Sequence, residues 1–534
     1  MAEVKKIKCR MEGRKKMDLQ LVQKVTVVAL VIFAALMVFI GVFSWKRTQA
    51  IEGFLLGGRN IGPWVSAFAY GTSYFSAVIF VGYAGKHGWD IGLGSIWIGI
   101  GNAVLGCYLA WKLLAKRTRS MTHRLSSKTM PEFFEERYNS TAFKVAAALI
   151  IFVFLVPYSA AVYKGLGSMF SAIFPNVPTT VWMLVIAVVT AAYLMLGGYV
   201  AAAYTDFVQG IIMIFGVFAM VIAIVNQGSV GGLGGFFERL ASVPDNGDGI
   251  TGAQLTNLFG GGSWKFLCVN ILLTSFGTWG LPQMVSKYYA IKDDNSIKTA
   301  TVVSTVFALI IGAGAYFIGS LSRLILNNNL PSGGYDSVIP DVLMKSLGGS
   351  LGTIIILSVV LLLLLSASMS TLSSVVLSSA SAISIDLVPT VKKNYTKRQE
   401  MLLTRFLCIL FVAFSYIFAT QNISIIVNIM SFSWGIVSGC FIGPYVWGIY
   451  SKKTTKAGAW AGMVCGFLTV AATTAVLTYL NCGADGIGAA FKAASSKAPE
   501  MGVAAMIVSL ITVPVVSSFT KKFDEEHINN VFIK

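Results

Sequence analysis

Charged residues are scarce in this sequence: Asp, Glu, Lys and Arg together make up 12% of its 534 residues, whereas apolar residues make up 55%. Soluble domains typically carry about 25% charged residues. Histidine is rarer still, with only His87, His123 and His527, and no nucleophile–base or metal-ligand spacing is present. These shortages exclude a soluble globular protein and argue against an enzyme, and we expect no cofactor.

Paired cysteine motifs are also missing. The seven cysteines lie mostly inside apolar runs without CxxC spacing, so we expect them to pack rather than to bind zinc or form disulfides. The net charge of +18 does not indicate nucleic-acid binding, because the basic residues stand in short segments beside apolar runs. The longest connectors, 227–263 and 328–351, are rich in Gly and Asn and are expected to be too short for a core of their own.

Long apolar runs are what the sequence has in abundance. Windows of about 20 apolar residues predict roughly thirteen membrane-spanning helices, and therefore an all-α membrane protein. The predicted spans are near 22–44, 61–85, 91–115, 142–173, 178–197, 205–226, 264–291, 298–327, 352–384, 401–419, 424–450, 457–479 and 501–518.

The basic residues predict how these spans are oriented, because short loops rich in Lys and Arg remain in the cytoplasm. Such loops lie at 46–59, 112–137, 287–298, 392–398 and 452–456. An odd number of spans in the plasma or inner membrane then places the N-terminus outside and the C-terminus in the cytoplasm. The basic residues before Met17 conflict with this orientation. Either the later loops outweigh them, or the natural chain starts at Met17.

Two predicted spans contain residues that interrupt a helix within the membrane. Residues 71–76 read Gly-Thr-Ser-Tyr-Phe-Ser, and residues 277–282 read Gly-Thr-Trp-Gly-Leu-Pro. Backbone carbonyls freed inside a membrane need partners, and burial in protein around a bound cation supplies them. Interrupted segments in corresponding positions of two halves are typical of the binding site of a transporter.

The two interruptions also divide the chain. Each opens a block of five predicted spans, 61–226 and 264–450. Since five is odd, the blocks enter the membrane from opposite faces and form an inverted repeat, which permits alternating access. The remaining predicted parts are a basic extension (1–21), a first helix (22–44), two C-terminal helices (457–518) and a cytoplasmic tail (519–534).

The ninth predicted span carries a dense run of hydroxyl side chains between Ser366 and Ser374. At about 100° per residue, Ser370 shares a helix face with both of these serines, and Thr371 lies beside it. Hard cations prefer several oxygen ligands, which these hydroxyls and the carbonyls of the first break would supply. Membrane Ser and Thr also commonly bond to the carbonyl four residues earlier, so the run alone is ambiguous.

Four strings resemble the sodium:solute symporter family: LLGGRNIGPW (55–64), GGYVAAAYTDFVQG (197–210), GLP (280–282) and SASMSTLSSVVLSSASAISIDL (366–387). The resemblance implies a LeuT-like fold and sodium-coupled transport. It also implies a sodium site formed by the carbonyls of Thr72, Phe75 and Ala367 and the hydroxyls of Ser370 and Thr371.

The same resemblance places Asp206 at the cytoplasmic start of the sixth span, on the release path of sodium. An Asp at a helix start also suits an N-cap, so we expect Asp206 to serve both purposes.

The solute pocket resembles two branches of the family. Tyr158 matches a pocket tyrosine of the proline-transporting branch, but Thr274 and Thr278 replace two of its aromatic residues and Tyr74 replaces its acid. The pantothenate-transporting branch is more similar, through residues 74–77, GLP and 336–340. The expected pocket residues are Tyr74, Tyr158, Thr274, Thr278, Trp279, Pro282, Gln283, Ser431, Ser433 and Trp434.

Other polar residues in the spans have simpler expected roles. Lys164 either snorkels to the outer surface or meets a solute carboxylate. The expected anchors at span ends are Lys265, Arg323 and Arg405, and the expected helix-bridging residues are Asn102, Asn270 and Asn428.

The sequence thus predicts a secondary active transporter that carries sodium and a small carboxylate or amino-acid-like solute, such as pantothenate or proline, in the same direction. Its oligomeric state stays open. A proton-coupled carrier would need a titratable group near the ninth span, where the sequence shows hydroxyls. A membrane sensor would need a signalling domain, which the tail after residue 519 is too short to hold.

Overall fold

The computed structural model describes residues 19–45, 51–261, 263–347, 350–392, 396–421, 423–482 and 486–532. These residues are almost entirely helical; the one β-bridge among them joins Ile61 to Ile291. The basic extension before Leu19 and the predicted cytoplasmic residues Lys46 and Arg47 lie outside the described residues.

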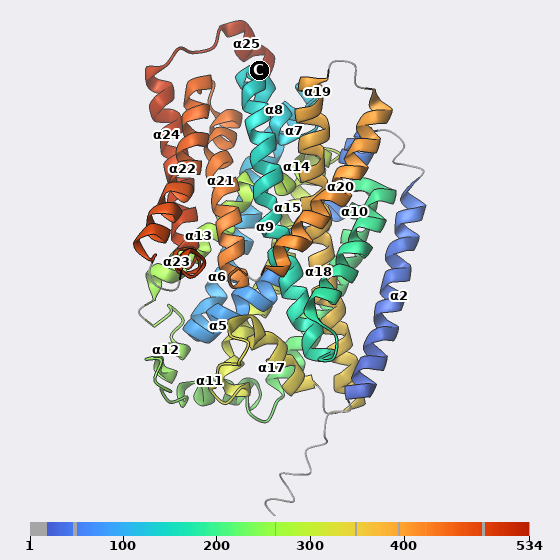
Figure 1. The fold of residues 1–534 in the computed structure, drawn as a ribbon, viewed down its shortest axis with the longest axis vertical. Coiled ribbons are helices and arrows are strands. Elements are labelled where there is room, and N and C mark those ends of the chain that lie inside the picture. The colour runs from blue at the N-terminus through green and yellow to red at the C-terminus, as the bar shows by residue number, and fades with distance from the viewer. Residues whose placement is uncertain are drawn as a thin grey trace, which may run out of the picture.

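The helices form a single bundle (Figure 1). Its long helices are α2 (Leu19–Trp45), α9 (Thr141–Ile173), α10 (Thr179–Val225), α15 (Asp294–Ser320), α18 (Leu351–Ser381), α20 (Lys397–Thr420), α21 (Ile426–Tyr450), α22 (Lys456–Leu480) and α24 (Ala498–Phe519). Shorter helices are α3 (Ile51–Leu56), α4 (Pro63–Tyr74), α5 (Gly85–Ile91), α6 (Ile96–Gly101), α7 (Lys116–Arg124), α8 (Met130–Tyr138), α11 (Gly232–Ala241), α12 (Gly252–Thr256), α13 (Trp264–Gly280), α14 (Pro282–Ala290), α16 (Ser322–Ile325), α17 (Val338–Leu347), α19 (Val388–Val391), α23 (Gly486–Ser495) and α25 (Glu525–Val531).

Ten helical stretches among the described residues are long and apolar enough to cross a membrane. The difference from the predicted number arises at three places. The stretch Pro63–Arg124 turns at Gly92 (φ 55°) and contains two predicted spans. Helix α10 turns at Gly198 (φ 51°, ψ −145°), and the apolar helix before this turn, Thr179–Ala192, is too short to be counted. The predicted span 264–291 is divided into α13 and α14. Every predicted span therefore coincides with helix.

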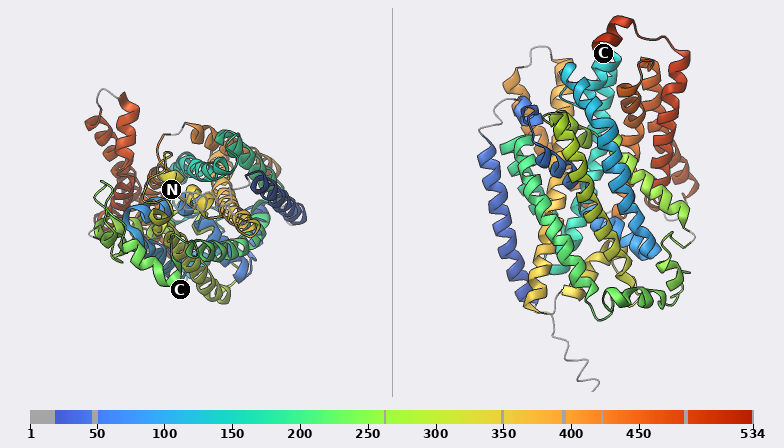
Figure 2. Two further views of the ribbon diagram at one scale, coloured as in Figure 1. Left: turned by 90° about the horizontal axis from the view of Figure 1, so that it is seen from below. Right: turned by 180° about the vertical axis from the view of Figure 1, so that it is seen from behind.

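Exposure of apolar side chains separates the rim of the bundle from its centre. Helix α2 lies on one side and α22 and α24 lie on the opposite side (Figures 1 and 2). On α2, Val31, Phe39 and Phe43 are more than half exposed, as expected for side chains that contact lipid. In contrast, 89% of the residues in the most apolar part of α21 are buried. Helix α21 therefore lies in the centre of the bundle, whereas α2 lies at its rim.

The connector between α10 and α13 has more structure than its Gly-rich sequence predicts. Leu240, Val243 and Leu255 of this connector pack with Leu93 of the bundle. The connector therefore has no separate core: its apolar side chains form a small cluster together with a residue of the bundle. Together with α17, the connector covers the end of the bundle opposite α25 (Figure 1).

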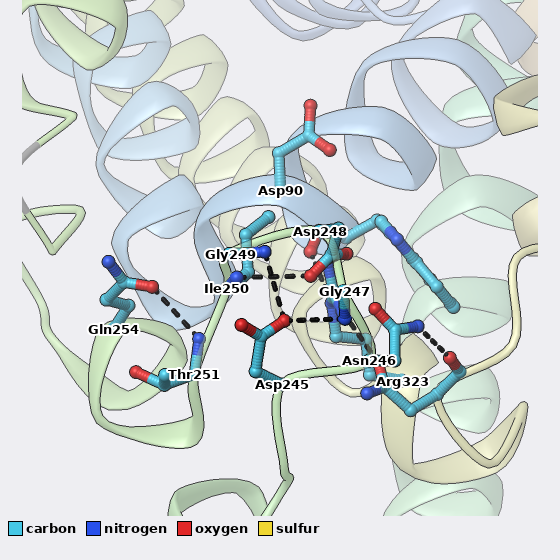
Figure 3. A network of polar contacts seen from close by, with 12 residues as sticks. Asp90, Asp245, Asn246, Gly247, Asp248, Gly249, Ile250, Thr251, Gln254 and Arg323 are labelled. Carbon is cyan, nitrogen blue, oxygen red and sulfur yellow. Dashed lines mark hydrogen bonds and ion pairs between the residues drawn. The ribbon is translucent and has the colours of Figure 1, made fainter.

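A polar network fixes the same connector to the bundle (Figure 3). Asp245 accepts hydrogen bonds from the amides of Gly247 and Gly249 at 2.9 and 3.0 Å, which closes a tight loop. Asp248 forms an ion pair with Arg323 at 2.7 Å. Arg323 is buried and also donates to the carbonyl of Trp89 at 2.8 Å. It thus anchors its span end to protein rather than to the lipid surface.

Candidate ion and solute site

The first predicted break lies directly after α4. Helix α4 ends at Tyr74, and Phe75 is extended (φ −100°, ψ 113°). Ser76 then starts the next helical segment: its carbonyl accepts from the amide of Ile79 at 3.0 Å and its hydroxyl accepts from that of Val78 at 3.2 Å. The break is confirmed, but it lies at 75–76, and residues 71–73 remain helical, contrary to the prediction.

The second break lies where it was predicted. Leu281 is extended (φ −85°, ψ 122°) between α13 and α14, and Pro282 starts α14 without an amide hydrogen that would need an acceptor. Gly280 brings this break close to α21, since a Cβ at that position would lie 2.9 Å from the backbone of Ser438. The chain therefore requires glycine here for the close contact between the helices.

Helix α18 brings its hydroxyl groups to the first break. The Thr371 hydroxyl lies 3.0 Å from the carbonyl oxygen of Ala367, 3.2 Å from that of Ser73 and 3.4 Å from that of Thr72. One hydroxyl has a single hydrogen to donate, so these three carbonyls cannot all be satisfied by it. All four residues are fully buried. This group of oxygens suits a small hard cation.

Ser370 completes this group. Its hydroxyl donates to the hydroxyl of Thr72 at 2.7 Å, and Thr72 donates in turn to the carbonyl of Phe68 at 2.8 Å. On the other side of the break, the Ser368 hydroxyl accepts from the amide of Ala77 at 3.1 Å. Four of the five predicted sodium ligands, Thr72, Ala367, Ser370 and Thr371, therefore lie together. The fifth, Phe75, is buried at the break, and the role of its carbonyl stays a prediction.

Asp206 does not cap a helix, so that part of the prediction is wrong. It lies inside α10 beyond the turn at Gly198, because the helix restarts earlier than the sequence indicated. Its carboxylate is fully buried, with Oδ2 3.7 Å from Nζ of Lys287. The Lys287 ammonium also donates to the hydroxyl of Ser374 at 3.0 Å.

Lys287 is a residue that the sequence analysis assigned to a basic cytoplasmic loop. In the structure it belongs to α14 and is 1% exposed. The available signal was its apolar setting, between the second break and a pair of tyrosines. Its partner Asp206 places a titratable group near α18, so the expectation that only hydroxyls lie there is wrong.

The aromatic residues of the predicted pocket surround Trp434 of α21. The ring of Tyr158 meets the Trp434 ring edge-on with centroids 5.8 Å apart, and the ring of Tyr74 stacks on it at 6.2 Å. The Tyr74 hydroxyl donates to the carbonyl of Thr274 on α13 at 2.7 Å. Tyr74 therefore contacts α13 and α21 from the end of the interrupted helix α4.

Several polar atoms of this group have no hydrogen-bond partner among the described residues. They are the Tyr158 hydroxyl, Nε1 of Trp434, and both the oxygen and the nitrogen of the Gln283 side-chain amide. None of the three residues is more than 1% exposed. A buried polar atom without a partner costs about 1–3 kcal/mol, so a solute that bonds to these atoms would be favoured.

The other predicted pocket residues are engaged in contacts between helices. Thr274 donates to Oδ1 of Asn102 at 2.7 Å, and Nε1 of Trp279 donates to the carbonyl of Leu105 at 3.1 Å. The remaining contacts are those of Thr278 with the carbonyl of Gly106, Ser431 with the hydroxyl of Tyr83, and Ser433 with the carbonyl of Phe154. Asn102 thus bridges helices as predicted.

Two expected roles for polar residues are wrong. Asn270 donates to the carbonyl of Phe266 within α13, and Asn428 donates to the hydroxyl of Ser424, which lies just before its own helix α21, so neither of these bonds joins two helices. Lys164 does not snorkel. It forms an ion pair with Asp336 at 3.0 Å and donates to the carbonyl of Ser424 at 2.6 Å, because Asp336 also lies at this end of the bundle.

Known proteins match most of the chain. The family model described as "Sodium:solute symporter family" matches residues 54–466. The osmoregulated proline transporter OpuE of Bacillus subtilis (strain 168) is 27% identical over 448 residues, which cover 83% of this chain and 87% of the relative. The sodium/proline symporter of Escherichia coli (strain K12) is 28% identical over 442 residues, which cover 81% and 84%.

Solved structures match the fold. The substrate-bound outward-open state of a Na⁺-coupled sialic acid symporter matches with a TM-score of 0.72 and 17% identity, covering 93% of this chain and 98% of that chain. The closed conformation of Mhp1, a nucleobase-cation-symport-1 family transporter, matches with a TM-score of 0.50 and 15% identity, covering 90% and 97%. The predicted all-α, LeuT-like membrane fold is confirmed.

Proposed function

The chain belongs to the sodium:solute symporter family, a family of transporters and not of enzymes, and we propose that it imports a small carboxylate or amino-acid-like solute together with sodium. Proline and pantothenate represent the proposed solute class. Transport proceeds by alternating access around a site between the two broken helices.

The group of oxygens around Thr371 supports this proposal most directly. A sodium ion there would bind the carbonyls of Thr72 and Ala367 and the hydroxyls of Ser370 and Thr371, which belong to α4 and α18. By joining these two helices, the ion orders Tyr74, which follows the same break and stacks on Trp434. Each ligand then raises the affinity for the other by the same factor.

The unpaired polar atoms support the solute class. The Tyr158 hydroxyl, the Trp434 ring nitrogen and the Gln283 amide nitrogen are all hydrogen-bond donors, which suits a carboxylate. The aromatic rings of Tyr74 and Trp434 would cover the apolar part of a small solute. The two relatives described above are proline carriers by name, which also favours an amino-acid-like compound.

Uptake into proteoliposomes tests the proposal. A thermal-shift screen of amino acids, vitamins, sugars and short carboxylates, each with and without sodium, selects the solute. Its uptake is then measured with sodium, potassium or choline outside. We expect uptake with sodium alone, and a membrane potential adds about 2.3 kcal/mol per 100 mV for each charge carried inward. Undiminished uptake in choline would refute sodium coupling.

Proton coupling is the second candidate, and one observation favours it. Asp206 is a buried carboxylate that lies near the hydroxyls of α18 through Lys287 and Ser374. A proton-coupled carrier would take up solute in choline when the outside is made acidic, and this uptake would be lost in Asp206→Asn. Uptake that needs sodium at every pH would exclude this candidate.

A further inference from the structure

A buried lysine lies beside the candidate sodium site. Lys287 Nζ is 3.7 Å from Oδ2 of Asp206, 3.0 Å from the Ser374 hydroxyl and 4.9 Å from the centre of the Tyr199 ring. Lys287 is 1% exposed and Asp206 is fully buried. The ammonium is therefore surrounded by a carboxylate, a hydroxyl and an aromatic face, all of which attract cations.

These groups are joined to the oxygens of the first break. The Ser374 hydroxyl, which accepts from Lys287, lies 2.8 Å from the hydroxyl of Ser73. The carbonyl of Ser73 is one of those around Thr371. The hydroxyls of Ser73 and Ser374 thus connect the candidate sodium site to the ammonium, which also contacts the buried carboxylate of Asp206. Without the lysine, they would be suitable ligands for a second alkali ion.

We propose that Lys287 acts as a resident cation: its ammonium neutralises Asp206 and occupies the space where a second alkali ion would bind, so that one sodium accompanies each solute. This inference rests on the proposed function. It makes Lys287 a residue that sets the number of coupled ions. If the role of Lys287 were only structural, it would hold α14 against α10 and α18 and would not affect the number of sodium ions.

The physical reason lies in the cost of an unpaired buried charge. A carboxylate in a dry interior requires a counter-cation or a proton. When Lys287 is replaced by methionine, which has a similar length and no charge, Asp206 loses its partner while the hydroxyls of Ser374 and Ser73 remain. Sodium at high concentration then fills the vacated space.

Sodium dependence of uptake tests this inference. For Lys287→Met we expect the Hill coefficient for sodium to rise from near one to near two. The charge moved per solute, obtained from the reversal potential in proteoliposomes, should increase by one elementary charge. The conservative Lys287→Arg retains the cation and should keep a Hill coefficient near one. Asp206→Asn/Lys287→Met removes both charges and should return the coefficient to near one.

Each outcome decides the matter. A Lys287→Met protein that binds solute with an unchanged Hill coefficient and unchanged charge movement overturns the inference. So does a variant whose lost activity is recovered by acid and not by sodium. If Lys287→Met does not fold, the double variant decides, since it lacks any unpaired charge: a Hill coefficient near two there overturns the inference. Sodium-independent uptake by the parent protein would instead refute the proposed function.

Discussion

The two broken helices differ in what surrounds them. At the first break, the neighbouring helix α18 contributes hydroxyls, and carbonyls and hydroxyls lie within hydrogen-bonding distance of one another. At the second break, α21 contributes Trp434, and the side-chain amide of the nearby Gln283 has no partner in the described part of the chain. A break only frees backbone groups. The helix packed against it determines whether the site suits an ion or an organic solute.

Tyr74 connects the two regions. It is the last residue of α4 before the first break, and its hydroxyl donates to the carbonyl of Thr274 on the helix that leads to the second break. A change in the backbone at the first break must therefore move a side chain that packs on Trp434. This contact gives a physical route for coupling between ion and solute. Substitutions in one region should therefore separate ion effects from solute effects.

Removal of the Thr371 hydroxyl should have the largest effect. We expect Thr371→Ala to raise the sodium concentration for half-maximal uptake about tenfold, equivalent to about 1.4 kcal/mol, because one oxygen ligand is lost. Ser370→Ala should act in the same direction. Sodium titration of uptake at saturating solute measures this.

Ser358→Ala is the matched control for Thr371→Ala. Ser358 is also buried on α18, but its hydroxyl donates only to the carbonyl of Ile354 in the same helix, at 3.1 Å. Its removal should leave the sodium dependence unchanged. Equal sodium dependence in Thr371→Ala and the parent would show that the assigned oxygens are wrong.

Removal of one unpaired hydroxyl tests the second region. We expect Tyr158→Phe to weaken solute binding about fivefold, close to the 1 kcal/mol of an ordinary hydrogen bond. Tyr163→Phe is its control, because Tyr163 lies on the same helix and its buried hydroxyl also has no partner among the residues that the structure describes, but the rings that stack on Trp434 are those of Tyr74 and Tyr158. Equilibrium solute binding at saturating sodium measures both. An equal loss in the two variants would contradict the assigned pocket.

Asp206→Asn tests the link between the regions. The substitution leaves the buried Lys287 ammonium without a charged partner, so we expect turnover to fall about threefold or more, whereas surface expression falls less. Initial uptake rates normalised to the amount of protein in the membrane measure this. Asp206→Glu retains the charge and should recover part of the rate. A loss explained entirely by lower expression would assign Asp206 a role in folding alone.

The apolar runs and the residues that interrupt them were sufficient to predict the membrane-spanning helices and the two breaks. The second break was predicted at its observed position because Pro282 cannot donate an amide hydrogen. The first was predicted a few residues early, since Gly71 is compatible with helix when Phe307 packs against it. The helical spacing of the hydroxyl residues also predicted that Ser370 and Thr371 lie side by side, and both hydroxyls contact the end of α4 at the first break.

The sequence did not predict which polar side chains meet, because their partners lie on helices that are distant in the chain. Lys287 was predicted to begin a basic cytoplasmic loop, and only the fold places it against Asp206 of another helix. The same holds for Gln283 and Tyr158: the burial that leaves their side-chain polar atoms without a partner among the described residues comes from the fold and cannot be read from the sequence. Arg323 resembled a membrane anchor because its partner Asp248 lies in a connector without a recognisable pattern.

The connector at the far end of the bundle should be least sensitive. Asp248 is 35% exposed, but its partner Arg323 is buried and would keep only its hydrogen bonds to Trp89 and Asn328, so Asp248→Asn should lower the free energy of unfolding by about 1 kcal/mol and leave the sodium dependence unchanged. Burial raises the pKa of Asp248, but the hydrogen bonds from Arg323 and the amide of Ile250, together with the charge of Arg323, lower it by more, so the pKa lies below its usual value. The ion pair therefore stabilises the protein above the pKa of the unfolded chain and is lost as the pH falls through the lowered pKa. Thermal unfolding and sodium titration of Asp248→Asn measure this. If Asp248→Asn shifted the sodium dependence as strongly as Thr371→Ala does, sodium binding would not depend specifically on the oxygens at the first break.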